Sequence, residues 1–197
     1  MLKPGERLIC DGPAVEHLIA SMAAELARTR RPDGPLRLVG VRTRGVPLAN
    51  RLAAELAGLL GAEVPVGAVD ITLYRDDLGR TQTWPVLRGT EIAFDIEGAD
   101  LVLVDDVLFT GRTVRAALNA VCDLGRPASV RLAVLVDRGH RELPIRADVV
   151  GLELKTERGD RIRVRLRPAD PDDEIVAVGS GPATPSAPTA TTGGPPP

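Results

Sequence analysis

Two adjacent carboxylates, Asp105 and Asp106, follow a run of apolar residues in the stretch LVLVDDVLFTGRT at 101 to 113. Because burying an unpaired charge is costly, we expect both aspartates to lie where a strand leaves the core, close to polar groups. The residues FTGRT then predict a tight turn into a helix, and Gly111 permits close backbone approach. Turn N–H groups, threonine hydroxyls and the positive end of a helix bind phosphate. The stretch is therefore a candidate phosphate site beside a pair of carboxylates.

A ribose phosphate suits this combination of groups. Its phosphate would occupy the turn, its hydroxyls would donate to the carboxylates, and magnesium would be shared among carboxylates, hydroxyls and further phosphates. The acidic pair alone leaves two alternatives open, which are magnesium binding in a nucleotide hydrolase and capping of a strand end. The sequence contains neither a GxxxxGK[ST] motif nor a GxGxxG fingerprint, which weighs against P-loop and dinucleotide-binding proteins.

Strands, loops and helices are predicted to alternate along the chain. Apolar residues at helical spacing predict helices over 13 to 31, 46 to 60 and 113 to 124, and short apolar runs predict strands over 36 to 41, 64 to 74, 101 to 104, 129 to 136 and 147 to 154. This pattern implies an α/β fold with a mostly parallel sheet flanked by helices. Ligands bind such sheets at the carboxyl ends of strands near a topological switch point, where RTRG, DDVLFTGRT and DRGH are expected.

Composition favours one soluble domain that acts on a small molecule. The 197 residues are 44% hydrophobic, and a net charge of −2 gives no global attraction to nucleic acid or anionic membranes. Cys10 and Cys122 are isolated, which weighs against a disulfide framework or a zinc site. With no signal peptide and no apolar run long enough to span a membrane, we expect a cytoplasmic protein.

Two segments near the carboxyl terminus, at 161 to 167 and 179 to 197, differ in character. RIRVRLR at 161 to 167 alternates strictly, so its arginines share one face of a strand, which we interpret as a solvated edge. From 179 to 197 the chain consists of Gly, Pro, Ser, Thr and Ala and cannot offset its ordering entropy. We therefore expect one domain over 1 to 178 and a disordered tail over 179 to 197.

The pattern of apolar residues, DD and TGxT resembles the phosphoribosyl-diphosphate motif of type I phosphoribosyltransferases. In addition, VGVRTRGVPLANRLA, VPVGAVDITLYRDDL and LAVLVDRGHRELPIRAD resemble the PyrR family, over residues 8 to 178. Members of that family are pyrimidine operon attenuators that are also uracil phosphoribosyltransferases. The resemblance implies a type I phosphoribosyltransferase fold with a flexible loop over the site. It also implies conversion of uracil and 5-phosphoribosyl diphosphate (PRPP) to UMP and diphosphate, with magnesium bound to PRPP.

The resemblance also implies roles for individual residues. Thr43, Arg44 and Gly45 would form the diphosphate loop, and Arg75 would reach the diphosphate from a mobile loop at 74 to 82. The catalytic residues would be Asp105, Asp106 and Arg44, with both aspartates meeting magnesium indirectly through the ribose hydroxyls. The remaining PRPP-binding candidates are Leu101, Val102, Leu103, Val104, Val107, Leu108, Phe109, Thr110, Gly111, Arg112 and Thr113.

The stretch DRGHRELP at 137 to 144 would lie on the uracil side of the site, through Asp137, Arg138, Gly139 and His140. We favour a positional role for His140 over general base catalysis, because no orienting partner for its imidazole is identifiable in the sequence.

Binding of pyrimidine operon leader mRNA, controlled by UMP or UTP, would use Arg138, Arg141 and Arg146 on the surface of a homodimer or higher oligomer. Two segments, VEHLIASMAAELA and GLELKTE, depart from the family where it contacts RNA. Three alternatives remain open: a salvage enzyme without RNA binding, an RNA-binding nucleotide sensor with little catalysis, and a purine or orotate phosphoribosyltransferase.

Overall fold

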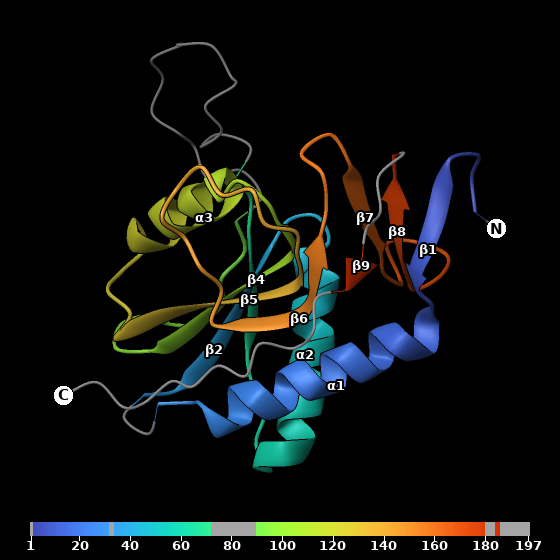
Figure 1. Ribbon diagram of the computed structural model, residues 1–197. Helices are drawn as coiled ribbons and strands as arrows, with labels where there is room; N and C mark the ends of the chain where they lie inside the picture. Colours follow the sequence, from blue (N-terminus) through green and yellow to red (C-terminus); the bar gives the residue numbers. More distant parts are fainter. Residues whose placement is uncertain (1, 32–33, 72–89, 180–183, 186–197) are drawn as a thin grey trace.

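The computed structural model describes residues 2–31, 34–71, 90–179 and 184–185. Within these ranges the strands form a six-stranded main sheet and a three-stranded small sheet (Figure 1). The main sheet has the order β3-β2-β4-β5-β6-β9 and the small sheet has the order β1-β8-β7.

The main sheet is parallel from β3 to β6. Its members are β2 (Leu36–Val41), β3 (Val66–Val69), β4 (Asp100–Leu108), β5 (Ser129–Asp137), β6 (Val149–Lys155) and β9 (Thr184–Pro185). Only β9 runs antiparallel to its neighbour. The chain adds β3 on one side of β2 and then crosses to place β4 on the other side, so the switch point lies between β2 and β4. The carboxyl ends of these two strands are where a ligand is expected.

Helices cover both faces of the main sheet (Figure 1). Helices α1 (Gly12–Arg28) and α2 (Gly45–Leu60) share one apolar core with Val102 and Val104, whereas α3 (Arg112–Cys122) shares the other with Leu101 and Leu103. Successive β4 side chains therefore face opposite cores, as a strand buried on both faces requires. The predicted α/β fold is confirmed.

Local signals account for several helix ends. The Asp11 carboxylate accepts a hydrogen bond from the Ala14 N–H at 3.1 Å and caps the start of α1. Gly61 follows α2 in the left-handed conformation, with φ 65°, and its N–H donates to the Ala57 carbonyl. Both helix ends therefore follow from residues next to them in the sequence.

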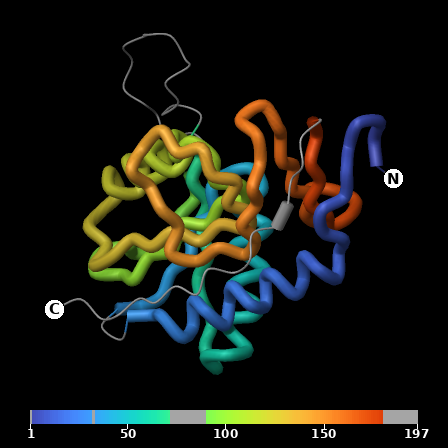
Figure 2. Tube along the Cα trace, in the orientation of Figure 1, coloured from blue at the N-terminus to red at the C-terminus, as the bar shows by residue number. Residues whose placement is uncertain are grey.

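The small sheet was not predicted. It joins β1 (Glu6–Cys10), β8 (Glu174–Val178) and β7 (Arg161–Arg165) in antiparallel register. Figure 2 shows the two ends of the domain side by side there, because β1 pairs with β8. The alternation in β7 is confirmed, and β7 is an edge strand. Its arginines are not simply solvated, however, since Arg163 and Arg165 both pair with Glu6 across the small sheet.

Two predicted strands have different lengths in the structure. The pairing of β4 with β5 continues to the partners Leu108 and Asp137, so Asp105 and Asp106 lie within β4 rather than after its end. Strand β3 covers only four residues of the predicted 64 to 74. The predicted mobile loop at 74 to 82, with Arg75, lies outside the described residues, as does the tail apart from Gly179 and β9.

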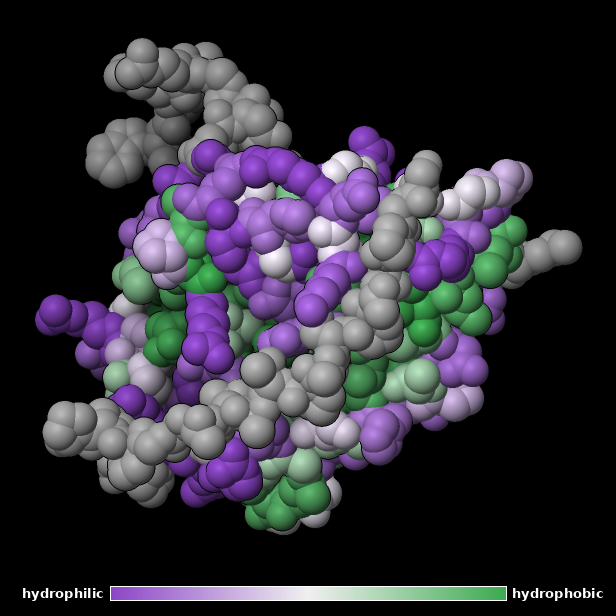
Figure 3. All heavy atoms as spheres, in the orientation of Figure 1, coloured by the Kyte–Doolittle hydropathy of each residue, from purple (hydrophilic) through white to green (hydrophobic). Residues whose placement is uncertain are grey.

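None of the described helices combines the length and apolar character needed to cross a bilayer. Polar side chains cover most of the face shown in Figure 3, and apolar side chains emerge beside the small sheet. Leu8 of β1 is 44% exposed.

The buried carboxylate of Glu6 gives the small sheet a pH-dependent contribution to stability. Hydrogen bonds from Arg165 and from the Lys3 N–H lower the pKa of Glu6 to about 2. A carboxylate with a lowered folded pKa stabilises the protein above its unfolded pKa, and this stabilisation is lost as the pH falls through the folded value. Glu6→Gln should therefore lower the unfolding midpoint at neutral pH.

Thermal unfolding followed by circular dichroism from neutral pH downward would measure this effect. The difference between Glu6→Gln and the original chain should shrink as the pH falls from the ordinary glutamate value of 4.5 toward about 2. A difference that did not depend on pH would show that Glu6 acts through packing rather than through its charge.

Candidate active site

The loop at 42 to 44 joins β2 to α2, and Gly45 after it lies against Val104 and Asp105 of β4. A Cβ atom on Gly45 would come within 2.3 Å of the Val104 carbonyl oxygen, and one on Gly40 would come within 2.6 Å of the Gly45 carbonyl oxygen. Only glycine tolerates these approaches. The peptide bond between Arg42 and Thr43 is cis. The two glycines thus bring the predicted diphosphate loop next to the acidic pair.

Asp105 and Asp106 occupy the carboxyl-terminal part of β4, beside this loop. Asp105 is 5% exposed and its carboxylate accepts the Asp106 N–H at 2.9 Å, while Asp106 is partly exposed. Burial and the neighbouring charge of Asp106 raise the pKa of Asp105 well above its ordinary value. Burial also raises the pKa of Asp106, although its hydrogen bond with Asp105 and the charge of Arg44 act against the rise. The pair therefore holds a proton more readily than two exposed aspartates would.

The predicted turn and helix follow β4 directly. Gly111, the residue before α3, has φ 90° and no side chain with which to cap this helix. The Thr110 hydroxyl accepts the Arg112 N–H at 3.4 Å. First-turn N–H groups without intrahelical partners, together with the helix dipole, form a site for an anion. The turn thus has the geometry expected of a phosphate cradle.

The PRPP-binding candidates include six apolar residues of β4. Leu101, Val102, Leu103, Val104 and Leu108 are at most 1% exposed, and Val107 packs against the core that α1 and α2 cover. The five buried side chains cannot contact PRPP, which corrects that expectation for them, whereas Val107 is partly exposed and stays a candidate. Phe109 to Thr113 follow the strand and remain candidates.

The loop that follows β5 is docked onto the phosphate turn. The N–H groups of Glu142 and Leu143 donate to the Thr110 carbonyl at 3.0 and 3.3 Å. The Arg141 guanidinium donates to the Phe109 carbonyl at 2.7 Å and also pairs with Asp137. These contacts couple the expected uracil-side loop to the turn that would hold the phosphate.

Arg138 is buried rather than presented to a ligand. It is 5% exposed, and its guanidinium donates to the carbonyls of Glu157 and Asp160. The same guanidinium lies over the Phe109 ring, 4.1 Å from its centroid. The plane of the guanidinium therefore supports Phe109 from the protein interior. The burial of Arg138 corrects the expectation that this side chain contacts RNA.

Arg141 and Asp137 are likewise occupied by the loop itself. The Asp137 carboxylate accepts the Gly139 N–H at 2.9 Å in addition to its pairing with Arg141. The remaining Arg141 contacts are to backbone carbonyls of the same region, including Ile145 at 3.1 Å. These groups shape the loop, and Arg141 is not a free cation for RNA.

His140 has the orienting partner that the sequence did not reveal. Its Nε2 lies 2.7 Å from the Thr156 carbonyl oxygen, and its ring meets Phe109 edge-on at 6.0 Å between centroids. Because a carbonyl oxygen only accepts, Nε2 carries the hydrogen, and Nδ1 is the nitrogen left for a ligand. Residue 140 also has φ 61°, a conformation concentrated at functional sites in residues other than glycine.

Sequence reasoning missed Thr156 and Asp170. Thr156 holds the loop at 138 to 140, because its hydroxyl also donates to the Arg138 carbonyl at 3.1 Å. Asp170 binds Arg44 through two hydrogen bonds of 3.1 Å each. Both residues lie in polar turns far along the chain from their partners, and no local pattern marks them.

The raised pKa of Asp105 predicts a stabilising substitution. An acid whose folded pKa is raised above its unfolded value of 3.8 loses folding stability as the pH rises through the folded value. Asp105→Asn keeps the acceptor for the Asp106 N–H and removes the ionisation. Its unfolding midpoint should therefore match that of the original chain near pH 4 and exceed it near pH 8.

Asp100 at the other end of β4 provides the matched control. It is 1% exposed and paired with Arg131 at 2.7 Å, and despite its burial the Arg31 N–H, Arg131 and Ser129 lower its pKa. Asp100→Asn should cost about 3 kcal/mol at neutral pH, because Arg131 is left buried without its counterion. Equal destabilisation by both substitutions would contradict the assignment of a repulsive pair to Asp105 and Asp106.

Comparison with known proteins identifies the family. Residues 8–163 match the model of the phosphoribosyl transferase domain. The chain is 54% identical to "Bifunctional protein PyrR" of Roseiflexus sp. (strain RS-1), over 84% of this chain and 91% of that protein. It is 52% identical to the protein of the same name from Chloroflexus aurantiacus, over 87% and 94%.

Solved structures with low sequence identity share the fold. A hypoxanthine phosphoribosyltransferase from Trypanosoma cruzi superimposes with a TM-score of 0.67 at 20% identity, covering 87% of this chain and 94% of the other. One from Staphylococcus aureus gives a TM-score of 0.59 at 19% identity, over 77% and 79%. The sheet order, the two juxtaposed loops and the extent of identity lead to one conclusion: the chain belongs to the PyrR family of phosphoribosyl transferase domain proteins.

Proposed function

We propose that this chain transfers the phosphoribosyl group of PRPP to uracil, giving UMP and diphosphate. The observation that carries the proposal is the close approach of the 42 to 44 loop to Asp105 and Asp106, next to the start of α3, where the residue before the helix is a glycine. Three kinds of group therefore meet at the carboxyl ends of β2 and β4: an arginine, a pair of carboxylates and a helix amino end. Together they offer binding partners for the diphosphate, the ribose and the 5-phosphate of one molecule.

Each part of PRPP has a corresponding group on the protein. Backbone N–H groups at the start of α3 and the threonine hydroxyls of the turn would bind the 5-phosphate. Asp105 and Asp106 would accept hydrogen bonds from the ribose hydroxyls, and Arg44 would bind the diphosphate through its planar guanidinium. Thr43 and Gly45 would contribute backbone groups beside Arg44.

Magnesium would enter with the substrate. No group of three or more His, Cys, Asp or Glu side chains that could hold a metal by itself occurs among residues 2–31, 34–71, 90–179 and 184–185. Burial raises the pKa of both carboxylates, and the charge of Asp106 adds to the rise at Asp105. A neighbouring cation would favour their ionised forms, and Asp105 and Asp106 would hold it through the ribose hydroxyls. Bound magnesium supplies neutralisation of the charge on the departing diphosphate.

The reaction needs no protein nucleophile. The bond between ribose C1 and the diphosphate oxygen breaks with its electron pair on the diphosphate, and a bond forms between C1 and uracil N1, whose proton leaves to solvent. Arg44 stabilises the leaving group, and the two aspartates fix the sugar as positive charge develops on its ring. We assign His140 a positional role, with Nδ1 toward the base. Arg75, which lies outside the described residues, would close over the diphosphate and exclude water.

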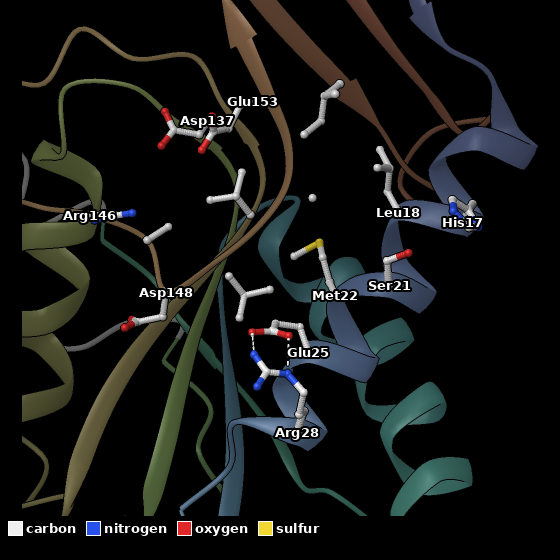
Figure 4. A pocket seen from close by; sticks show the side chains of 15 residues that line it. His17, Leu18, Ser21, Met22, Glu25, Arg28, Asp137, Arg146, Asp148 and Glu153 are labelled. Carbon is white, nitrogen blue, oxygen red and sulfur yellow. Dashed lines mark hydrogen bonds and ion pairs between the residues drawn. The ribbon is translucent and has the colours of Figure 1, made fainter. Parts of the chain in front are cut away.

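A second role, binding of pyrimidine operon leader mRNA, is supported by the bifunctional name of relatives that are about half identical to this chain. Arg146 is the remaining RNA candidate, because Arg138 and Arg141 serve the protein interior and the loop. It lines a groove of about 690 Å³ between α1 and β6 (Figure 4). We also propose, from the family resemblance, a cytoplasmic homo-oligomer.

Charge in the groove argues against strong RNA binding. Its charged lining consists of Glu25, Arg28, Asp137, Arg146, Asp148 and Glu153. Four of these side chains are acidic and only two are basic, and Arg28 is already paired with Glu25 at 2.6 Å. Because phosphate contacts dominate RNA affinity, this balance favours the enzymatic role over the regulatory one.

Release of diphosphate with PRPP, magnesium and a panel of uracil, hypoxanthine, guanine and orotate tests the enzymatic proposal. We expect turnover with uracil alone, and Asp106→Asn should reduce that turnover by roughly two to three powers of ten through loss of a preorganised charge. Turnover with a purine or orotate instead of uracil would overturn the choice of base. Normal turnover by Asp106→Asn would overturn its assigned role.

A gel shift on the pyrimidine operon leader, with and without UMP, tests the regulatory proposal. If Arg146 contacts RNA phosphate, Arg146→Ala should weaken the complex for all leader sequences and make its affinity less dependent on salt. Arg28→Ala removes a groove arginine that is already paired and serves as the control. Uracil turnover without any shift would leave a salvage enzyme alone.

A further inference from the structure

Arg44 is bound by a carboxylate from a distant part of the chain. Its Nε donates to Asp170 Oδ2 and its Nη2 donates to Asp170 Oδ1, each at 3.1 Å. Asp170 lies in the turn between β7 and β8 of the small sheet, whereas Arg44 directly precedes α2 beside the main sheet. The pair therefore joins the diphosphate loop to the small sheet through a two-point contact.

The atoms used in this contact leave the rest of the guanidinium available. An arginine side chain has five N–H donors in one plane, along a side edge formed by Nε and one Nη and a terminal edge formed by both Nη atoms. Asp170 occupies the side edge of Arg44. The terminal edge still has two parallel N–H donors, which is the geometry that a phosphate group accepts. The Arg44 side chain is 39% exposed and can meet a ligand there.

Asp170 is itself held firmly. Its side chain is 14% exposed, its Oδ2 accepts the Leu166 N–H at 3.0 Å, and its own N–H donates to the Leu166 carbonyl at 2.9 Å. Burial opposes its ionisation, but the Arg44 guanidinium and the Leu166 N–H outweigh burial and lower the pKa of Asp170. A fixed and ionised carboxylate can define the plane of the guanidinium that it binds.

We propose that Asp170 is a positioning residue for PRPP, which holds Arg44 by its side edge so that its terminal edge faces the diphosphate. The inference rests on the proposed function, because it takes the diphosphate as the ligand of Arg44. Asp170 does not touch the substrate and acts only through Arg44. The small sheet thereby takes part in diphosphate binding without contributing a ligand of its own.

A second arginine–aspartate pair at the same turn provides the control. Arg51 of α2 donates to Asp173 Oδ2 at 2.9 Å, and Asp173 Oδ1 accepts the Arg167 N–H at 2.8 Å. This pair also joins α2 to the small sheet, but it lies two helical turns along α2 from the diphosphate loop. If Asp170 merely anchored the turn, Asp173→Asn would reproduce the effects of Asp170→Asn.

Calorimetric titration with PRPP and magnesium in the absence of uracil, together with steady-state kinetics, would test the proposal. Asp170→Asn should raise both the Kd and the KM for PRPP by on the order of tenfold, because Arg44 loses a charge-assisted contact. The KM for uracil should not change. Asp170→Glu, which keeps the charge, should restore part of the affinity. Asp173→Asn should lower the unfolding midpoint and leave PRPP affinity unchanged.

A double-mutant cycle with Arg44→Ala separates positioning from a general loss of structure. In the Arg44→Ala background, Asp170→Asn should cause no further loss of PRPP affinity, because Asp170 acts only through Arg44. A loss that persists in that background would overturn the proposal, as would unchanged or tighter PRPP binding by Asp170→Asn alone. Failure of the original chain to bind PRPP or turn over uracil would instead refute the proposed function.

Discussion

The close packing of the 42 to 44 loop on β4 is the contact on which the site depends. Parallel pairing aligns Gly40 of β2 with Val104 of β4, so the loop after β2 lies beside Asp105 and Asp106, which continue β4. The loop after β2 can then lie on β4 only because Gly45 brings no side chain against the Val104 carbonyl. A larger residue there would push the arginine away from the carboxylates and separate the proposed diphosphate site from the proposed ribose site.

Local patterns were sufficient to predict five of the six strands of the main sheet and to bring the candidate site residues to one edge of it. The strand over 36 to 41 and the helix ending before Gly61 have the expected bounds, because apolar periodicity and a left-handed glycine are local signals. Topology then determined where the polar stretches would meet, since ligands bind at the switch point of an open parallel sheet. The acidic pair and the phosphate turn could be placed without knowledge of any distant contact.

Long-range contacts could not be predicted in the same way. In the small sheet β1 pairs with β8, which lies at the other end of the domain sequence. The sequence of neither strand indicates which strand it pairs with. Asp170 and Thr156 could not be predicted either, because they contact residues that are distant in the sequence. Arg138 was misjudged because an arginine in a polar stretch is usually exposed, whereas this one satisfies backbone carbonyls beneath Phe109.

Asp105 and Asp106 have an unfavourable electrostatic free energy in the unliganded fold, which a bound ligand would reduce. In the free protein the two carboxylates repel each other in a poorly solvated position, and burial favours their protonated forms. A ribose that donates hydroxyl hydrogen bonds to both oxygens would favour the ionised forms instead. Part of the binding free energy would then come from removing an unfavourable interaction that the unliganded fold tolerates.

The two hydrogen-bonding edges of a guanidinium explain why arginine suits position 44. A lysine ammonium is a compact point charge and could neutralise a diphosphate, but it has no second edge by which the protein could fix its direction. The guanidinium can bind Asp170 on one edge and a phosphate on the other. Asp170 lies in the turn between β7 and β8 of the small sheet. The position of that sheet would therefore determine the direction of Arg44 at the proposed diphosphate site. With the proposed role of Arg44, the small sheet would be coupled to substrate binding as well as to stability.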